Sequence, residues 1–317
     1  MTRVLRIIGT LIALTCIGVL IAQQAQNLPT LDLTSPALWG WLGIGLIGYV
    51  LSQCAAAEAW RSILSLWGVQ IAPHMARGQP MVSQIGKYTP GNVAHLFGRL
   101  MLAKKDGVNA GIVAASMVME VAITLAVGLG TAVLLLVALP DALPNLTARY
   151  PELATRLVPV SAGVLGAIGI GVGAIFLKSR LNAIDVARPS TAALMRPVAL
   201  HLASFGILGV SLWATAQAIA PATAPGIVTS TLIFAVAWAV GFVVPGAPGG
   251  IGVRDSIIVL GLAVSVGEGS GLAIAILHRG VSVLGDVTTF GIGWRLRRPR
   301  SEAISKNRPE PASFPAI

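Results

Sequence analysis

Long runs of hydrophobic residues, separated by short polar stretches, recur along the whole chain. Most runs approach the roughly 20 residues that an α-helix needs to cross a hydrocarbon core about 30 Å thick. The sequence lacks the short alternating strands that are typical of a transmembrane barrel. The pattern therefore predicts an all-α polytopic membrane protein with eight transmembrane helices, at Val4–Ala22, Leu38–Trp60, Gly107–Val137, Leu157–Leu177, Pro197–Ala220, Pro225–Val244, Asp255–Val266 and Ser270–Gly293.

The first run, Val4–Ala22, has a second interpretation as a cleaved signal peptide, because Arg3 and Arg6 accompany its start. However, the run is long for the apolar region of such a peptide, and the glutamines that follow it make a poor cleavage site. We therefore expect a retained first helix.

Two stretches fit neither a span nor a free loop. Residues Met75 to Met101 are too polar to cross a membrane and too apolar for a loop, and residues Phe242 to Val266 are apolar but broken by glycine and proline. Irregular backbone at membrane depth is tolerated only where it is buried in protein or lines a wet cavity, because unpaired amides in lipid are costly. We expect both stretches to be re-entrant or interrupted helices.

The two interrupted stretches share a short pattern. Pro90-Gly91 precedes Arg99 with the same spacing by which Pro245-Gly246 precedes Arg254, and each copy follows two predicted spans and precedes two. Paired segments broken by glycine and proline in the two halves of a duplicated transporter indicate the substrate site. The pattern predicts one transmembrane domain, residues 1–296, with similar halves at about 1–180 and 190–296; the halves are parallel repeats if the seventh span crosses the membrane.

Composition and charge agree with a membrane environment and orient the chain in it. Hydrophobic residues make up 55% of the chain and charged residues only 11%, against about 25% charged in soluble domains. All but three of the 22 Lys and Arg residues fall on one side of the eight-span arrangement. The positive-inside rule then predicts a multi-pass protein of the cell (plasma or inner) membrane with both termini in the cytoplasm.

The net charge of +10 needs no nucleic-acid partner. Topology accounts for it, and basic residues at the cytoplasmic surface also attract anionic headgroups. Residues 297–317 are basic and rich in proline, so we expect a disordered cytoplasmic tail.

The interrupted stretches offer the chemistry of anion binding. Glycines leave backbone N–H groups accessible, the start of a helix carries partial positive charge, and an arginine supplies a planar fork for phosphate. Two alternatives stay open: the glycines serve close helix packing, and Arg99 and Arg254 anchor the topology at the cytoplasmic edge. In the binding interpretation a phosphodiester is cradled by Gly246, Gly249, Gly250 and Gly252, ahead of Arg254.

Three charged residues, Glu120, Arg279 and Asp286, lie inside predicted spans, where ionisable groups are expensive and are candidates for function. At 1.5 Å per residue, Glu120 and Arg279 lie at similar depths of roughly 18–20 Å, so we expect them to meet near the midplane. Asp286 is a second candidate partner of Arg279 because it lies on nearly the same helical face. A structural ion pair between the halves and a direct role in transport both remain open.

Other polar residues suggest no catalytic or metal chemistry. The sequence contains no Walker, GxSxG or HExxH pattern and no metal-ligand spacing among His74, His95 and His201. We therefore expect no enzymatic activity and no cofactor. The remaining predictions are a local pair between Glu58 and Arg61, packing roles for Cys16, Cys54 and His278, and no disulfide.

Several of these segments resemble one known family. Gln84–Asn92, followed by Gly98-Arg99, is similar to the first signature of the lysylphosphatidylglycerol synthase transmembrane family, and Val244–Asp255 with the later Leu277–Arg279 is similar to the second. The family usually carries Glu where this chain has Asp255. Similar pairs also occur at Trp60-Arg61 and Met119-Glu120, and the resemblance extends from about Val4 to Arg295.

The resemblance implies a flippase-like protein. Family members fused to a cytoplasmic aminoacyltransferase domain make and flip aminoacylated phosphatidylglycerol. No such domain follows the last span in this sequence, so we expect a stand-alone member that translocates a phosphate-bearing lipid, such as a phospholipid or a polyprenyl-phosphate-linked glycan. The expected partners are membrane lipids.

Three other functions compete with this one. They are a non-transporting membrane partner of an envelope glycosyltransferase or lipid-modifying enzyme, a small-solute transporter, and an intramembrane enzyme. The enzyme is the least favoured, because its only candidate acid/base groups are Glu120, Asp255, His278 and Asp286. For lipid translocation, the candidate headgroup-binding residues are Lys87, Tyr88, Pro90, Gly91, Asn92, Arg99, Pro245, Gly246, Gly249, Gly250, Gly252, Arg254 and Asp255, with Glu120, Arg279 and Asp286 as the buried charges.

Overall fold

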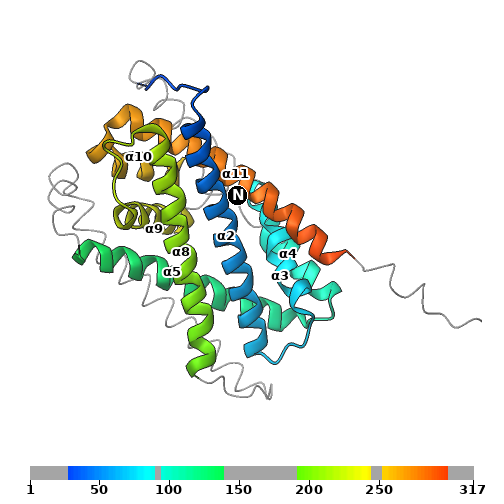
Figure 1. Cartoon of the computed structure of the whole chain (residues 1–317). Helices are drawn as coiled ribbons and strands as arrows, with labels where there is room; N and C mark the ends of the chain where they lie inside the picture. Colours follow the sequence, from blue (N-terminus) through cyan, green and yellow to red (C-terminus); the bar gives the residue numbers. More distant parts are fainter. Residues whose placement is uncertain (1–27, 90–93, 139–190, 244–251, 299–317) are drawn as a thin grey trace, which may run out of the picture.

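The computed structural model describes residues 28–89, 94–138, 191–243 and 252–298, and these residues form helices without any strand (Figure 1). In chain order the elements are α2 (Pro36–Leu66), α3 (Pro73–Ser83), the 3-10 helix η2 (Gln84–Tyr88), α4 (Ala94–Lys105), α5 (Ala110–Ala138), α8 (Thr191–Ile219), α9 (Ile227–Val243), α10 (Val253–Val266) and α11 (Glu268–Arg297).

Four of these helices, α2, α5, α8 and α11, are long and apolar enough to cross a membrane. They correspond to four of the predicted spans and confirm an all-helical, multi-pass protein. α9 is a shorter apolar helix. α10 has 14 residues, and such a helix is only about 21 Å long. Its crossing of the bilayer therefore stays a prediction.

Several predictions concern residues outside the described ranges. They are the spans Val4–Ala22 and Leu157–Leu177, both PG segments, Cys16, and the tail from residue 299 onward.

The first interrupted stretch is broken into three short helices, α3, η2 and α4. α3 begins with Pro73 in its first turn and contains Pro80. Proline is favourable in the first turn, where its missing N–H would have no partner, but it disrupts a helix interior. The break that the sequence predicts between residues 75 and 101 is therefore present, whereas a re-entrant path through the membrane stays a prediction.

α2 and α8 pack closely and run antiparallel, side by side in Figure 1. A Cβ added to Gly45 would lie 3.2 Å from the Thr215 hydroxyl, and one added to Gly48 would lie 3.5 Å from the backbone oxygen of Ile207. Ser211 also donates a 2.7 Å hydrogen bond to the Gly45 carbonyl. Small residues and a hydroxyl at the contact are typical of helix association in membranes.

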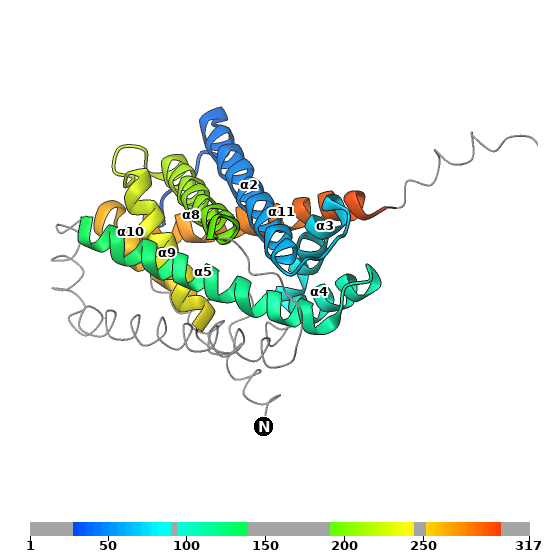
Figure 2. The same ribbon diagram turned by 90° about the horizontal axis from the view of Figure 1, so that it is seen from below.

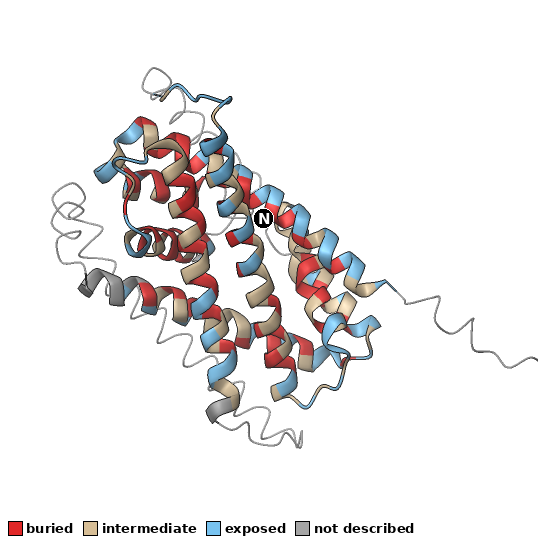
Figure 3. Cartoon of the chain, in the orientation of Figure 1, coloured by how far each residue is buried: buried red, intermediate tan, exposed pale blue. Residues whose placement is uncertain are grey.

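α5 crosses the other helices and contacts α9, α8, α2 and α4, as Figure 2 shows from below. The main core lies among α2, α8, α9, α10 and α11 and includes the fully buried Leu212, Phe234, Leu262 and Ile274. Large apolar side chains also cover outward faces, for example Ile47 and Leu51 on α2 and Leu284 and Val287 on α11. Figure 3 shows buried and exposed residues alternating along the same helices. An apolar exterior over long helices is expected where lipid, and not water, surrounds the protein.

Candidate functional site

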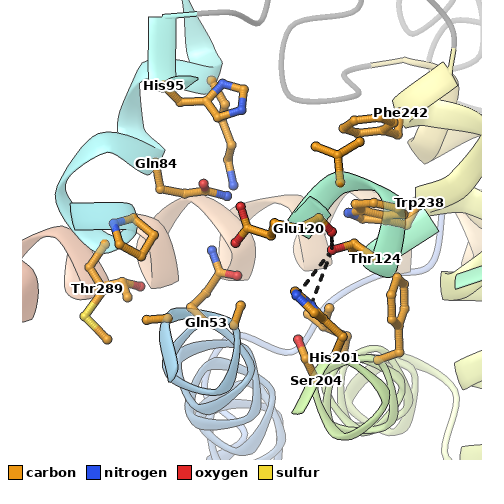
Figure 4. A pocket seen from close by; sticks show the side chains of 18 of the residues that line it. Gln53, Gln84, His95, Glu120, Thr124, His201, Ser204, Trp238, Phe242 and Thr289 are labelled. Atoms are coloured by element: carbon orange, nitrogen blue, oxygen red, sulfur yellow. Dashed lines mark hydrogen bonds between the residues drawn. The ribbon is translucent and has the colours of Figure 1, made fainter. Parts of the chain in front are cut away.

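A cavity of about 220 Å³ lies where η2, α4 and the beginning of α10 meet α2, α5, α8, α9 and α11. Figure 4 shows its side chains converging from these elements, with Gln84 and His95 on one side and Trp238 and Phe242 on the other. Three cationic side chains, Lys87, Arg99 and Arg254, and one carboxylate, Glu120, contribute to the wall. The arginines of both PG-x7-R copies thus reach the same cavity.

Arg99, on α4, is only 5% exposed. Its guanidinium lies 4.8 Å from the ring centroid of the buried Trp60, and one end forms an ion pair with Glu120 of α5. Its Nε is buried, and no described residue accepts a hydrogen bond from it. This environment does not fit an anchor at an exposed edge, where a basic side chain reaches polar headgroups or water.

Arg254, near the start of α10, is 8% exposed and lies with its guanidinium 5.7 Å from the Phe234 ring centroid. Its Nε is buried without a hydrogen-bond partner among the residues that the structure describes. None of the described carboxylates forms an ion pair with it. Arg254 is therefore a buried cation, beside the cavity, whose charge no described residue neutralises by direct contact.

The neighbouring residues orient the beginning of α10. Gly252 has φ +86°, which an L side chain rarely adopts. The Asp255 carboxylate accepts a 3.1 Å hydrogen bond from the Gly252 N–H and binds Arg279 of α11 at 2.7 Å through both of its oxygens. The first turn of α10 is thereby held against α11, and Arg254 lies within that turn.

Lys87 approaches the cavity from η2 and is held by Asp286 of α11, with 2.7 Å between Nζ and Oδ2. The same carboxylate accepts hydrogen bonds from Tyr49 at 3.1 Å, from Gln53 at 3.2 Å and from Tyr88. A buried carboxylate is tolerated when it is paired and hydrogen-bonded in this way. Asp286 therefore fixes η2, immediately before the first PG segment, against α2 and α11.

The predicted pair between Glu120 and Arg279 is wrong, and so is Asp286 as the partner of Arg279. Glu120 pairs with Arg99, Arg279 with Asp255, and Asp286 with Lys87. Glu120 and Arg279 both lie in long helices, but these helices are not the only sources of buried charge. The interrupted stretches instead fold between those spans and bring their own charged side chains to each buried group.

The rest of the wall combines polar side chains and aromatic rings that the sequence interpretation did not select. Thr124 of α5 lies 3.4 Å from both ring nitrogens of His201, and Ser204 is one turn further along α8 (Figure 4). Trp238 and Phe242 stack with ring centroids 5.2 Å apart. A histidine or hydroxyl group within an apolar span is visible in the sequence. However, the sequence does not show whether such a residue lines a cavity or packs against another helix.

His95 of α4 also lines the cavity, and its Nδ1 is buried without a partner in the described part of the chain. Burial, together with the nearby Arg99 and Lys87, lowers the pKa of His95 to about 4. The imidazole is therefore neutral near pH 7 and offers one donor and one acceptor nitrogen.

Two smaller predictions can be compared with the structure. The local pair between Glu58 and Arg61 is confirmed, and the same carboxylate also binds Arg77 and Arg196 at 2.7 Å each. His278 is a buried packing residue, with its ring edge-on to Phe234 at 5.6 Å. The described residues contain no group of His, Cys, Asp and Glu that could hold a metal ion.

The candidate residues divide into three groups. Lys87, Arg99, Arg254 and Glu120 line the cavity, whereas Tyr88, Gly252, Asp255, Arg279 and Asp286 make contacts that hold the cavity's elements. The others lie outside the described residues: Pro90, Gly91, Asn92, Pro245, Gly246, Gly249 and Gly250.

Long apolar helices around a buried basic cavity define a polytopic helical membrane protein with a site suited to an anion. The sequence profile of one family, described as the lysylphosphatidylglycerol synthase TM region, matches residues 6–288, so the chain belongs to this family. Family membership relates the protein to lipid handling. None of the curated proteins matches the chain.

Proposed function

We propose that the protein translocates a lipid with a phosphate-bearing headgroup and that the headgroup binds in the cavity. The observation that carries this proposal is the position of Arg254, buried beside the cavity and without an acidic partner among the described residues. An unpaired buried cation is unfavourable by several kcal/mol. A transient anionic ligand offsets that cost, and a guanidinium donates two parallel hydrogen bonds to phosphate.

Further features of the cavity support an anion. Arg254 belongs to the first turn of α10, where backbone N–H groups and the helix dipole favour negative charge. Lys87 and Arg99 also line the cavity, and the nitrogens of Arg99 and His95 that lack a partner among the described residues are further hydrogen-bonding groups. The acyl chains of the bound lipid would remain in the bilayer, because the cavity of about 220 Å³ has room only for a headgroup.

The finer features of this function are also proposals. They are eight crossings in two similar halves, two re-entrant PG segments that line a groove for the lipid, both termini in the cytoplasm of the cell membrane, and no enzymatic activity. The supporting observations are the charge distribution, the breaks on either side of residues 90–93, and the convergence of Arg99 and Arg254.

The test is a translocation assay with the purified full chain in liposomes that contain fluorescently labelled phosphatidylglycerol. The wild-type chain is expected to expose inner-leaflet label to an external quencher. Arg254→Gln should slow this exposure about tenfold or more, the loss expected for one charge-assisted contact worth about 1.4 kcal/mol. Lys104→Gln removes one positive charge from an exposed position of α4 and serves as the control.

The outcomes separate this function from its main alternative. No label movement with the wild-type chain, together with co-purification of an envelope glycosyltransferase or lipid-modifying enzyme, would support a non-transporting membrane partner. If the labelled lipid moved equally fast with the wild-type chain and with Arg254→Gln, the headgroup would not pass through the cavity.

A further inference from the structure

The charges around the cavity balance almost completely. Lys87 pairs with Asp286, Arg99 with Glu120, and Arg279 with Asp255. Arg254 is the fourth cation of this group and has no such pair among the described residues. The PG segments at 90–93 and 244–251 contain no ionisable residue. Among the described residues around the cavity, four cations and three carboxylates therefore leave one positive charge, with the histidines counted as neutral.

The pairing also leaves no free carboxylate among the described lining residues for a positively charged ligand. Each of the three carboxylates is already bound to a basic side chain, and the Asp286 side chain is completely buried. An ammonium group in the cavity would need an acidic partner, and among the described lining residues the only carboxylate, Glu120, is committed to Arg99. A headgroup that carries an added amine would therefore bring an unpaired positive charge next to Arg254, and like charges repel each other strongly in a buried site.

The magnitude of the residual charge discriminates among phosphate groups. A phosphodiester carries one negative charge, whereas a phosphomonoester carries about −1.5 to −2 at pH 7 and a diphosphate carries more. One residual positive charge is neutralised by the phosphodiester and over-compensated by the others. The cavity volume of about 220 Å³ lies below the roughly 300–1,000 Å³ of pockets that hold a whole drug-sized ligand. A phosphodiester with one small polar substituent is a ligand of this smaller size.

We infer that the ligand headgroup is an unmodified phosphodiester with one net negative charge, and not an aminoacylated headgroup, a phosphomonoester or a diphosphate. This inference rests on the proposed function and specifies its substrate. Arg254 binds the phosphate, and Lys87 and Arg99 contribute little net charge because each keeps its own carboxylate. Polar groups such as Gln53, Thr124 and Ser204 provide partners for hydroxyls of the substituent.

The experiment ranks water-soluble ligands on the full chain in detergent micelles by calorimetric titration. The ligands are dihexanoyl phosphatidylglycerol, its lysyl ester, dihexanoyl phosphatidic acid and geranyl diphosphate. The wild-type chain should bind the phosphatidylglycerol about tenfold more tightly than each of the other three, the ratio expected for about 1.4 kcal/mol of charge mismatch. This ranking requires no variant and is not affected by any folding defect.

Two variants then change the residual charge in opposite directions. Glu120→Gln raises it from one to two, so the preference should shift towards phosphatidic acid and geranyl diphosphate. Arg254→Gln removes it, so the advantage of phosphatidylglycerol over its lysyl ester should disappear. Lys104→Gln changes the total charge of the chain outside the cavity and should keep the wild-type ranking.

Tightest binding of the lysyl ester or the diphosphate to the wild-type chain would overturn the inference, and so would an identical ranking in wild type and a folded Glu120→Gln variant. In that case lipid movement in the liposome assay would still support the proposed function. If the wild-type chain neither binds nor moves any of these lipids, both the inference and the proposed function fail.

Discussion

The Nζ atom of Lys87 lies 2.7 Å from Oδ2 of Asp286, so the 3-10 helix η2 is tied directly to α11. Tyr49, Gln53 and Tyr88 donate hydrogen bonds to the same carboxylate. One buried acidic side chain thus joins three elements that are far apart in the sequence. The contacts around Asp286 hold Lys87 and Tyr88, which directly precede the first PG segment in the sequence, against α2 and α11.

Replacing Asp286 should therefore be strongly destabilising. Asp286→Ala leaves Lys87 without its ion-pair partner, and breaking a buried pair lowers the free energy of unfolding by about 3–5 kcal/mol. Thermal or denaturant unfolding of the chain in micelles measures this loss. Thr288→Ala, on an exposed position of the same helix, is the control and should change stability by less than about 0.5 kcal/mol. Equal stabilities of the two variants would contradict the role given to Asp286.

Trp60 is expected to position Arg99 without touching the ligand. Its ring lies 4.8 Å from the Arg99 guanidinium, and its Nε1 donates a 2.9 Å hydrogen bond to Gln79. Trp60→Leu removes a desolvated cation–π contact worth about 2 kcal/mol and should weaken phosphatidylglycerol binding about tenfold or more. Trp60→Phe retains an aromatic face, so it should weaken phosphatidylglycerol binding less than Trp60→Leu does.

A merely structural role for Trp60 would produce a different result. Thermal unfolding would then change in both variants, while the affinity of the folded protein for the lipid would stay at the wild-type value. Affinity measured on folded protein after size-exclusion chromatography distinguishes the two.

Gly285 is predicted to be required for the contact between α2 and α11. A Cβ at this position would collide with the ring of Tyr49, and overpacking of this kind costs about 1–3 kcal/mol. Gly285→Ala should therefore lower the unfolding temperature. Gly280→Ala lies on the same helix with nothing within 4 Å of the added methyl group, so it should stabilise the helix by up to about 1 kcal/mol. The unfolding temperatures of both variants are compared with that of the wild-type chain, and we expect changes of opposite sign. Changes of the same sign would contradict the close contact at Gly285.

The predicted topology can be tested by cysteine accessibility. In a chain with Cys16 and Cys54 replaced by serine, we expect Lys104→Cys and Arg298→Cys to react with a membrane-impermeant maleimide only after cells are permeabilised. Ala222→Cys, in the exposed connection between α8 and α9, should react in intact cells. This pattern follows from the distribution of basic residues. Labelling of Lys104→Cys in intact cells would show that the orientation is the reverse of the predicted one.

The cavity shows where sequence reasoning succeeded and where it failed. Arg99 and Arg254 were identified together because the same spacing links each to a PG pair, and spacing is a property of the chain itself. The pairing of Glu120 with Arg279 was wrong because equal depth in two spans says nothing about their neighbours. His201 and Trp238 were missed because an apolar span with a polar or aromatic residue looks the same whether that residue faces a cavity or a packed interface.

The sequence by itself determined that the chain is helical and embedded in a membrane, where its long apolar helices lie, and where the helical pattern breaks. These features depend on local hydrophobicity, on proline and glycine, and on the cost of unpaired backbone amides in lipid, all of which act over a few residues to one span. Only the tertiary structure decided which charges pair and which cation remains without a partner. Each of those contacts joins different helices, and a buried charge is stabilised by whichever partner the packing brings within a few ångströms.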